Sequence, residues 1–265
     1  MLKVLFIGDI SGKLGREAIK KILPKLKKES KYDLVIANSE NMAHGTGVTE
    51  STINEIMKAG VDYITTGDHA FKKDCDKNIY GGQMPIIRPA NFPPSNPGKG
   101  FALIKKGKKN ILLINLIGRV FMHADYDCPF RKVDKILTMF AKKNLSAIII
   151  DIHAEATSEK IALKHYLNGR VSAVLGTHTH VMTADGQITN QDTAFISDVG
   201  MTGSADGVIG VDKENIIKNF LDQMKYQHVL SEKGKAIFNA VELTIDEKSI
   251  KAKKIKPIIK FIDIK

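Results

Sequence analysis

Three short apolar segments near the start of the chain each end in polar residues, and each precedes a helical pattern. They cover residues 3–7, 32–38 and 62–66, and the residues that follow them include Asp9, Glu40, Asn41, Asp68 and His69. Such β-loop-α units predict an α/β sheet, in which ligands bind at the carboxyl ends of the strands. A single acidic residue at a strand end is usually a helix cap. Three in succession are hard to explain by capping alone, so we expect Asp9, Glu40 and Asp68 to reach one edge of a sheet.

The loop after the first strand could also suggest a nucleotide-binding loop. Its glycines, at positions 8, 12 and 15, fit neither the dinucleotide fingerprint nor the phosphate loop with its Gly-Lys-Ser/Thr ending. We therefore give this alternative little weight and retain Asp9 as the candidate functional residue.

Two further apolar segments, residues 146–152 and 171–175, lead into histidines. The first ends in DIHAE, which contains His153, and the second is followed by GTHTH, which contains His178 and His180. Side chains two residues apart in an extended segment point the same way, so we expect His178 and His180 to face one point, as two metal ligands must. Histidine pairs also occur in ordinary loops, and residues 175–180 alone leave both interpretations open.

The remaining elements follow from periodicity and from turn residues. Helices are expected at about residues 15–28, 49–59, 131–143, 158–167 and 213–224. Strands are expected at 101–105 and 110–116 as a hairpin, at 193–197, and at 236–245 and 249–261 as a half-exposed antiparallel pair. Prolines break any helix between residues 80 and 118, so a lid or loop region is expected at about 80–130. We expect one domain, residues 1–265.

Length and composition limit the class of protein. The chain has 265 residues with 43% hydrophobic content, which is enough for a large buried core. No run approaches the roughly 18 apolar residues of a membrane span, and the first strand opens the chain, so we expect a cytosolic protein without a membrane partner. Cys75 and Cys128 match no ligand spacing, so we expect reduced structural thiols.

The formal net charge is +11, which would favour polyanionic partners such as RNA. The charge is nearly all lysine, however, scattered over helix faces such as that of residues 20–28, and aromatic residues make up only 6% of the chain. An RNA-binding surface would carry more arginine and interleaved aromatic residues. A solvated surface is therefore favoured, and RNA stays a disfavoured partner.

The polar residues at the strand ends form a set with a clear chemistry. Two metal ions about 3.5–4 Å apart need many protein ligand atoms, among them a carboxylate that can bridge. Carboxylate, amide and imidazole ligands without thiolate favour a hydrolytic pair of iron, manganese or zinc ions, and hydrolysis of a phosphate ester is the expected reaction. The candidates are Asp9, Glu40, Asn41, Asp68, His69, His153, His178 and His180.

The same segments resemble the YmdB-like bacterial metallophosphoesterases over nearly the whole chain. The segments are GDISG (8–12), NSEN (38–41), GDH (67–69), DIHAEATSEK (151–160), GTHTHV (176–181) and DVGMTG (198–203). The resemblance implies a calcineurin-like α/β sandwich of mixed sheets flanked by helices. It also implies two metal ions and phosphodiesterase activity on 2′,3′-cyclic nucleotides.

The resemblance also implies a role for each site residue. One metal would be held by Asp9, Asn41 and His180, and the other by Asp68, His153 and His178. Glu40 would bridge the two ions, and His69 would donate a proton to the leaving oxygen.

Asp68 departs from the family pattern, which has Asn before the corresponding histidine. A carboxylate oxygen can still bind a metal, but its negative charge would reduce the Lewis acidity of the pair and could shift the metal preference. One alternative is therefore a regulatory nucleotide-binding protein with the same fold and little turnover. A second, motivated by the net charge, is an RNA-binding or RNA-processing factor. A homo-oligomer is compatible with either function.

Overall fold

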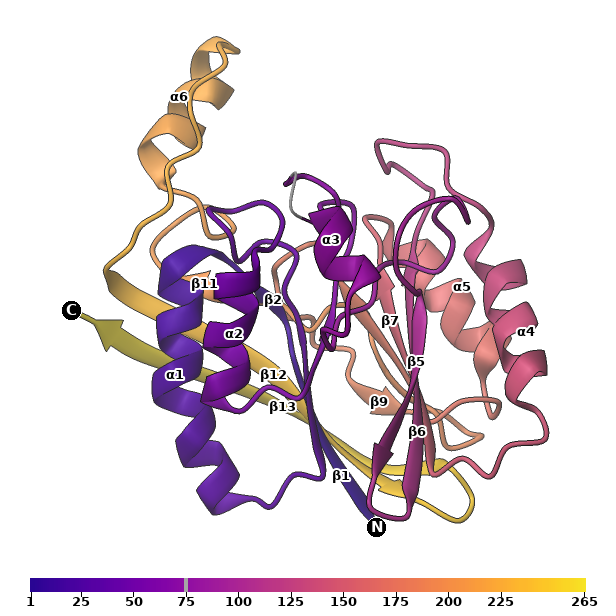
Figure 1. The fold of residues 1–265 in the computed structure, drawn as a ribbon. Coiled ribbons are helices and arrows are strands. Elements are labelled where there is room, and N and C mark those ends of the chain that lie inside the picture. The colour runs from indigo at the N-terminus through magenta and orange to yellow at the C-terminus, as the bar shows by residue number, and fades with distance from the viewer. Residues whose placement is uncertain (74–75) are drawn as a thin grey trace.

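The computed structural model describes residues 1–73 and 76–265, and the side chains of residues 1–73 and 78–265. Two β-sheets stack face to face, and helices cover both outer faces (Figure 1). This arrangement confirms the expected sandwich of mixed sheets flanked by helices.

The first sheet has seven strands, in the order β2-β11-β12-β1-β3-β4, with β13 beside β12. Neighbours β1, β3 and β4 are parallel, so their carboxyl ends lie at the same edge. The strands are β1 (Leu2–Ile7), β2 (Asp9–Ile10), β3 (Leu34–Asn38), β4 (Tyr63–Thr65), β11 (Met201–Ser204), β12 (Gly234–Asp246) and β13 (Lys251–Ile264).

The second sheet has six strands, in the order β5-β6-β7-β8-β10-β9. Here β6, β7, β8 and β10 are parallel, and β5 and β6 form the expected hairpin. The strands are β5 (Phe101–Lys106), β6 (Lys109–Ile117), β7 (Ala147–His153), β8 (Ala173–Thr177), β9 (Gln187–Ile188) and β10 (Ala194–Ile196).

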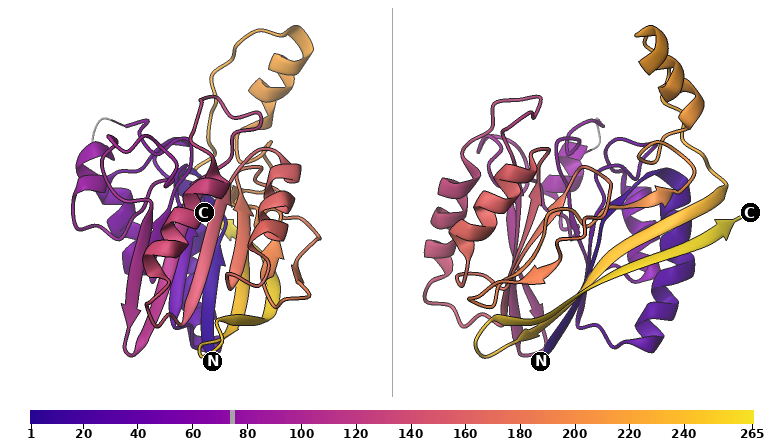
Figure 2. Two further views of the ribbon diagram at one scale, coloured as in Figure 1. Left: turned by 90° about the vertical axis from the view of Figure 1, so that its right-hand side faces the viewer. Right: turned by 180° about the vertical axis from the view of Figure 1, so that it is seen from behind.

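Four helices lie on the two outer faces, and another projects away from the sheets. Helices α1 (Gly12–Glu29) and α2 (Glu50–Ala59) cover the first sheet, and α4 (Pro129–Phe140) and α5 (Thr157–Leu167) cover the second (Figure 1). The short helix α3 is Asp76–Gly81, and α6 (Lys213–Asp222) projects from the body (Figure 2). Among the described residues, no helix combines the length and the apolar character needed to cross a membrane.

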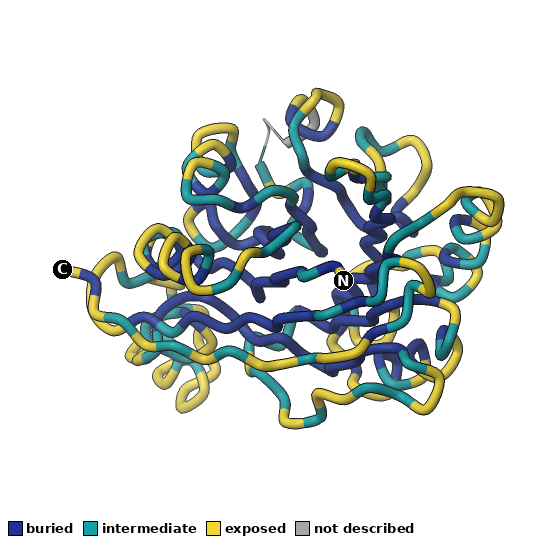
Figure 3. Tube along the Cα trace, turned by 90° about the horizontal axis from the view of Figure 1, so that it is seen from below, coloured by how far each residue is buried: buried dark blue, intermediate teal, exposed yellow. Residues whose placement is uncertain are grey.

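The alternating side chains of each central strand explain the core. On β1, Leu2, Val4 and Phe6 pack between the two sheets, whereas Leu5 and Ile7 pack toward α1. Both faces of the strands are therefore covered, which is why they appear in the sequence as continuous apolar runs. Seen from below, the buried strands lie inside and the exposed segments surround them (Figure 3).

Most of the expected elements are present, with some corrections. Helix α1 begins at Gly12 and not at about residue 15, and the short elements α3, β2, β9 and β11 were not expected. The exposed residues of α1 include Lys20, Lys21, Lys25 and Lys28, as expected for a solvated face. The single domain and the lid at about 80–130 stay predictions.

The two cysteines have different outcomes. Cys128 is a free, partly buried thiol, as expected. The expectation for Cys75 lies outside the described residues.

Candidate metal centre

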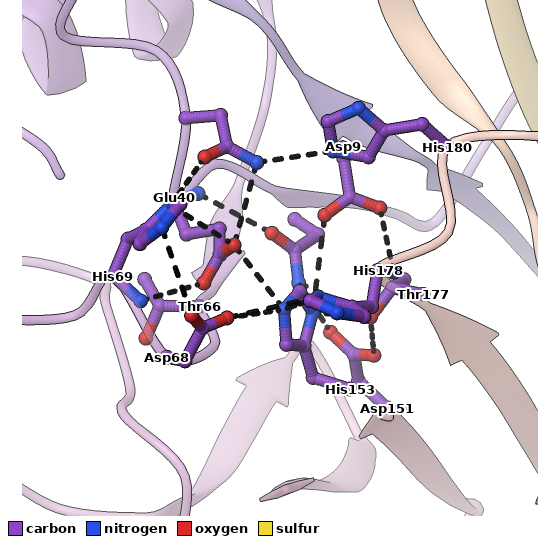
Figure 4. Close-up of polar contacts among 12 residues, drawn as sticks. Asp9, Glu40, Thr66, Asp68, His69, Asp151, His153, Thr177, His178 and His180 are labelled. Atoms are coloured by element: carbon purple, nitrogen blue, oxygen red, sulfur yellow. Dashed lines mark hydrogen bonds and ion pairs between the residues drawn. The ribbon is translucent and has the colours of Figure 1, made fainter. Parts of the chain in front are cut away.

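The carboxyl ends of strands from both sheets meet at one edge, and the eight candidate residues gather there (Figure 4, which labels all of them but Asn41). The first sheet contributes Asp9 at the start of β2, Glu40 and Asn41 after β3, and Asp68 and His69 after β4. The second sheet contributes His153, the last residue of β7, and His178 and His180 after β8. The site is therefore formed by two sheets and not by the edge of one.

Four of these residues form the centre of the site. Glu40, Asp68, His153 and His178 each offer one ligand atom, and these atoms all lie within 4.8 Å of one another. The Nε2 atom of His153 lies 3.2 Å from Glu40 Oε1 and 3.2 Å from Asp68 Oδ1. His178 Nδ1 lies 3.0 Å from His153 Nε2. Two carboxylates and two imidazoles that converge in this way could hold a metal ion.

Asn41, His69 and His180 lie beside this centre. Asn41 Nδ2 is 3.2 Å from His180 Nε2 and 3.3 Å from Glu40 Oε1, and Asn41 Oδ1 is 2.6 Å from His69 Nδ1. The backbone N–H of His69 donates to Glu40 Oε2 over 3.1 Å. Glu40 thus lies between the His153 side and the Asn41 side of the site.

Asp9 lies beside the Nδ1 atom of His153, whereas Glu40 and Asp68 lie beside its Nε2 atom. The Oδ2 atom of Asp9 accepts a hydrogen bond from the backbone N–H of His178 over 3.2 Å. Its Oδ1 lies 3.8 Å from His153 Nδ1 and has no hydrogen-bond partner among the described residues, although Asp9 is fully buried. A buried carboxylate oxygen without a partner is costly, and a bound cation would satisfy it. The donor set and this oxygen both fit a metal centre.

The charged groups perturb one another strongly. Burial raises the pKa of Asp9. Burial alone would lower the pKa of His153, but Glu40 and Asp68 raise it well above its ordinary value. Burial together with the His153 imidazole lowers the pKa of His178 to about 4. The buried carboxylates therefore attract one positive charge to the centre of the site, and a metal ion would replace the His153 proton in that position.

Gly67 allows Glu40 and His153 to approach the loop after β4. A Cβ atom at this position would lie 2.2 Å from His153 Cδ2 and 2.3 Å from Glu40 Oε2. Any larger residue would push these two side chains apart. The glycine before Asp68 is therefore required by the packing of the site.

A hydrogen-bond relay below the site orients His153. Thr177 Oγ1 donates to Asp151 Oδ1 over 2.8 Å, so it accepts from His153 Nδ1, 3.0 Å away. We assign one proton to Nδ1 from this network, so Nε2, which faces Glu40 and Asp68, is the nitrogen that would bind a metal ion once its own proton is displaced. Asn38 supports the relay by donating to Asp151 Oδ2 over 3.1 Å.

A buried ion pair holds the loop of His178 and His180. Lys160 Nζ lies 2.9 Å from Asp198 Oδ2, and both side chains are 1% exposed. The same Asp198 oxygen accepts from the backbone N–H and the hydroxyl of Thr179. The pair thereby fixes the residue between the two histidines.

The expected geometry of the two histidines is wrong, although both reach the site. His178 and His180 have positive φ angles, 106° and 66°, so the loop is not extended. The His178 imidazole reaches His153, and the His180 imidazole reaches Asn41. The two histidines therefore contact different residues of the site.

Several residues of the site had no role in the sequence interpretation. These are Asn38, Asp151, Thr177, Lys160, Asp198 and Glu155, whose Oε2 lies 3.1 Å from His178 Nε2. One signal was available, because Asp151 and His153 are two apart in a buried strand and so share a face. The partners that come from other strands gave no local signal.

A cavity of about 570 Å³ opens over the site, and Glu40, Asp68, His69 and His178 line it. Segments distant in sequence also line it and contribute Ile209, Val211 and Leu230. Its volume lies within the range of about 300–1,000 Å³ that is typical of small-molecule sites.

Comparison with known proteins gives a family match and close relatives. Residues 5–258 match the family model described as YmdB-like protein. The chain is 44% identical over 258 residues to a 2′,3′-cyclic-nucleotide 2′-phosphodiesterase of Bacillus subtilis (strain 168), and the match covers 97% of each chain.

Two crystal structures are similar over nearly their whole length. One, described as a hypothetical protein from Thermus thermophilus, is 38% identical with a TM-score of 0.91, and the match covers 98% of this chain and 99% of that chain. The other, described as a novel phosphatase of Mycoplasma pneumoniae, is 34% identical with a TM-score of 0.92, and the match covers 99% of this chain and 94% of that chain.

Proposed function

Because the chain belongs to the YmdB-like protein family, we propose that it is a metal-dependent phosphodiesterase that acts on 2′,3′-cyclic nucleotides. The observation that carries the proposal is the convergence of Glu40, Asp68, His153 and His178 at one edge of the two sheets. The name of the Bacillus subtilis relative supports the substrate class.

We propose two metal ions in this site. One would be held by Asp68, His153 and His178, and the other by Asp9, Asn41 and His180, and Glu40 would bridge them. The position of Glu40 between His153 and Asn41 supports the bridging role. Iron or manganese fits this set of oxygen and nitrogen donors, and zinc fits it as well.

The bound ions would supply Lewis-acid stabilisation of the phosphoryl group and would make a water molecule acidic enough to attack near neutral pH. The chain's own residues position these components. The Asp151–Thr177 relay keeps His153 Nε2 aimed at the centre, and Asp198 holds the loop that carries His178.

We propose that His69 protonates the leaving oxygen. Its side chain is 28% exposed and lines the cavity, so it can reach a substrate. Its Nδ1 is engaged by Asn41 Oδ1, which leaves Nε2, 3.6 Å from Asp68 Oδ2, as the nitrogen that would transfer the proton. Protonation of a departing alkoxide by a positioned imidazole contributes typically about 10²–10⁴-fold to the rate.

Asp68 can take the place of the family Asn in this arrangement. Its Oδ1 lies 3.2 Å from His153 Nε2 and 3.6 Å from His178 Nδ1, where an amide oxygen would also bind a metal. Its second oxygen, Oδ2, lies 3.6 Å from His69 Nε2. The extra charge is the reason to keep a nucleotide-binding regulator with little turnover as the second candidate function.

Metal analysis of the protein as isolated, followed by an assay of the protein loaded with Mn²⁺ or Fe²⁺, tests the proposal. We expect about two metal ions per chain and hydrolysis of 2′,3′-cyclic AMP. Tight nucleotide binding without hydrolysis of any phosphodiester would favour the regulator. A metal-to-chain ratio near zero that reconstitution cannot raise would exclude both proposed ions.

Other expectations stay predictions. They are the cytosolic location, the homo-oligomer and the disfavoured RNA partner. High affinity for RNA that falls steeply with salt would support the RNA-binding alternative.

A further inference from the structure

The segment of residues 207–232, which we call the arm, consists of α6 and the two stretches that connect it to the body. Helix α6 projects away from the sheets (Figure 2). The two connecting stretches lie together at the base of the arm, where the backbone N–H of Asp212 donates to Val229 O over 2.8 Å. Val208 and Val211 close the first stretch with two backbone hydrogen bonds, of 2.8 and 3.0 Å.

The base of the arm is built into the candidate site. Ile209, Val211 and Leu230 line the same cavity as Glu40 and His178. The backbone carbonyl of Ile209 lies 2.8 Å from His180 Nδ1, which places this loop directly behind a proposed metal ligand. The base of the arm is therefore a wall of the site.

Leu230 is held in place by two glycines on the body. A Cβ atom on Gly45 would lie 2.8 Å from Leu230 Cδ1, and one on Gly12 would lie 3.1 Å from it. Both glycines have positive φ angles, 85° and 60°, so their backbone conformations also disfavour larger residues. The leucine thus packs closely on backbone that carries no side chain, and its partly buried side chain lines the cavity.

Two chemically different sets of side chains line the cavity. Carboxylates and imidazoles make up one set, which suits a phosphoryl group and metal ions. The other set is Ile209, Val211 and Leu230 at the base of the arm, whose apolar side chains neither bind a metal nor transfer a proton. The imidazoles of His44 and His228 line the cavity as well and can exchange hydrogen bonds with a polar ligand edge.

We propose that Ile209, Val211 and Leu230 form the nucleoside subsite. The nucleobase of the substrate would pack against these three side chains, where the arm joins the body. A nucleotide combines a charged phosphate with a planar nucleobase whose faces are apolar, and this combination matches the two sets of side chains that line the cavity. Apolar contact with the base would be favourable by about 25 cal/mol per Å² buried. This inference rests on the proposed function and adds the residues that would select substrates by their nucleobase.

The test compares two substrates that share the reacting bonds. One is 2′,3′-cyclic AMP, and the other is methyl riboside 2′,3′-cyclic phosphate, which lacks the base. Leu230→Ala should reduce the ratio of kcat/KM for the nucleotide to kcat/KM for the base-free substrate about tenfold, which corresponds to about 1.4 kcal/mol. The control Leu221→Ala removes an 81% exposed leucine of α6 and should leave this ratio unchanged. An unchanged ratio in Leu230→Ala would overturn the inference while the proposed function stands.

A binding measurement separates the inference from the proposed function. Isothermal titration calorimetry with adenosine 3′-phosphate, on the protein as isolated, does not need turnover. About tenfold weaker binding to Leu230→Ala than to Leu221→Ala supports the subsite even if neither cyclic phosphate is hydrolysed. Equal affinity for the two variants refutes it.

Discussion

Gly67→Ala tests whether the packing around Glu40 and His153 sets the activity. The added Cβ would lie 2.2 Å from His153 Cδ2, whereas ordinary contact begins at 3.4 Å, so the two groups must separate by about 1.2 Å. A misplacement of about 1 Å in a catalytic constellation can reduce the rate about 10²-fold. We therefore expect kcat/KM to fall about 100-fold, equivalent to about 2.7 kcal/mol of transition-state stabilisation.

The assay follows hydrolysis of 2′,3′-cyclic AMP by the Mn²⁺-loaded protein, with metal content measured in parallel. Gly81→Ala is a matched control, because a Cβ at Gly81 meets no atom within 4 Å. The control should keep its activity, and both variants should keep the far-UV circular dichroism of the parent. Activity of Gly67→Ala within threefold of Gly81→Ala would refute the packing argument.

The remaining predictions concern the bridge, the proton donor and the buried ion pair. Glu40→Gln keeps the shape of the side chain but removes the bridging charge, so turnover should be abolished while the fold persists; full activity would remove Glu40 from the bridge. His69→Ala should keep its metals and lose about 10²–10⁴-fold on substrates with an alkoxide leaving group, but much less on an activated aryl phosphodiester. Equal losses on both substrates, with loss of metal, would make His69 a ligand or a structural residue. Lys160→Met should lower the free energy of unfolding by about 3–5 kcal/mol, because it leaves the Asp198 carboxylate buried without its partner; urea unfolding that matches the wild type would contradict this.

The strands and their polar ends could be predicted from the sequence because both faces of the central strands are buried. Strands such as β3 and β7 are buried along their whole length, and this produces apolar runs that end at Asn38 and Asp151, two residues before Glu40 and His153. Such a signal is local, so it can be found without knowledge of the fold.

The parts that could not be predicted depend on contacts between distant segments. The positive φ angles of His178 and His180 reflect a loop held by Asp198, which is contributed by another part of the chain. Strand β11 contains only small and polar residues apart from Met201, so it lacks an apolar pattern. The base of the arm lines the cavity through contacts with residues distant in sequence. The residues around Leu230 therefore carry no local signal that this side chain lies at the site.

Strand β13 is an outer strand with a consequence for solubility. It pairs with β12 along its length, and no other described strand covers its outer backbone edge, although the Ala252 N–H donates to Asp192 O near the start of the strand. Open edges invite pairing with strands of other molecules, and charged residues and proline oppose it. This strand carries Lys253, Lys254, Lys256 and Pro257, next to the exposed side chains of Ile259 and Phe261. Part of the excess positive charge therefore protects the protein from edge-to-edge aggregation, and this protection weakens in high salt, where charges are screened.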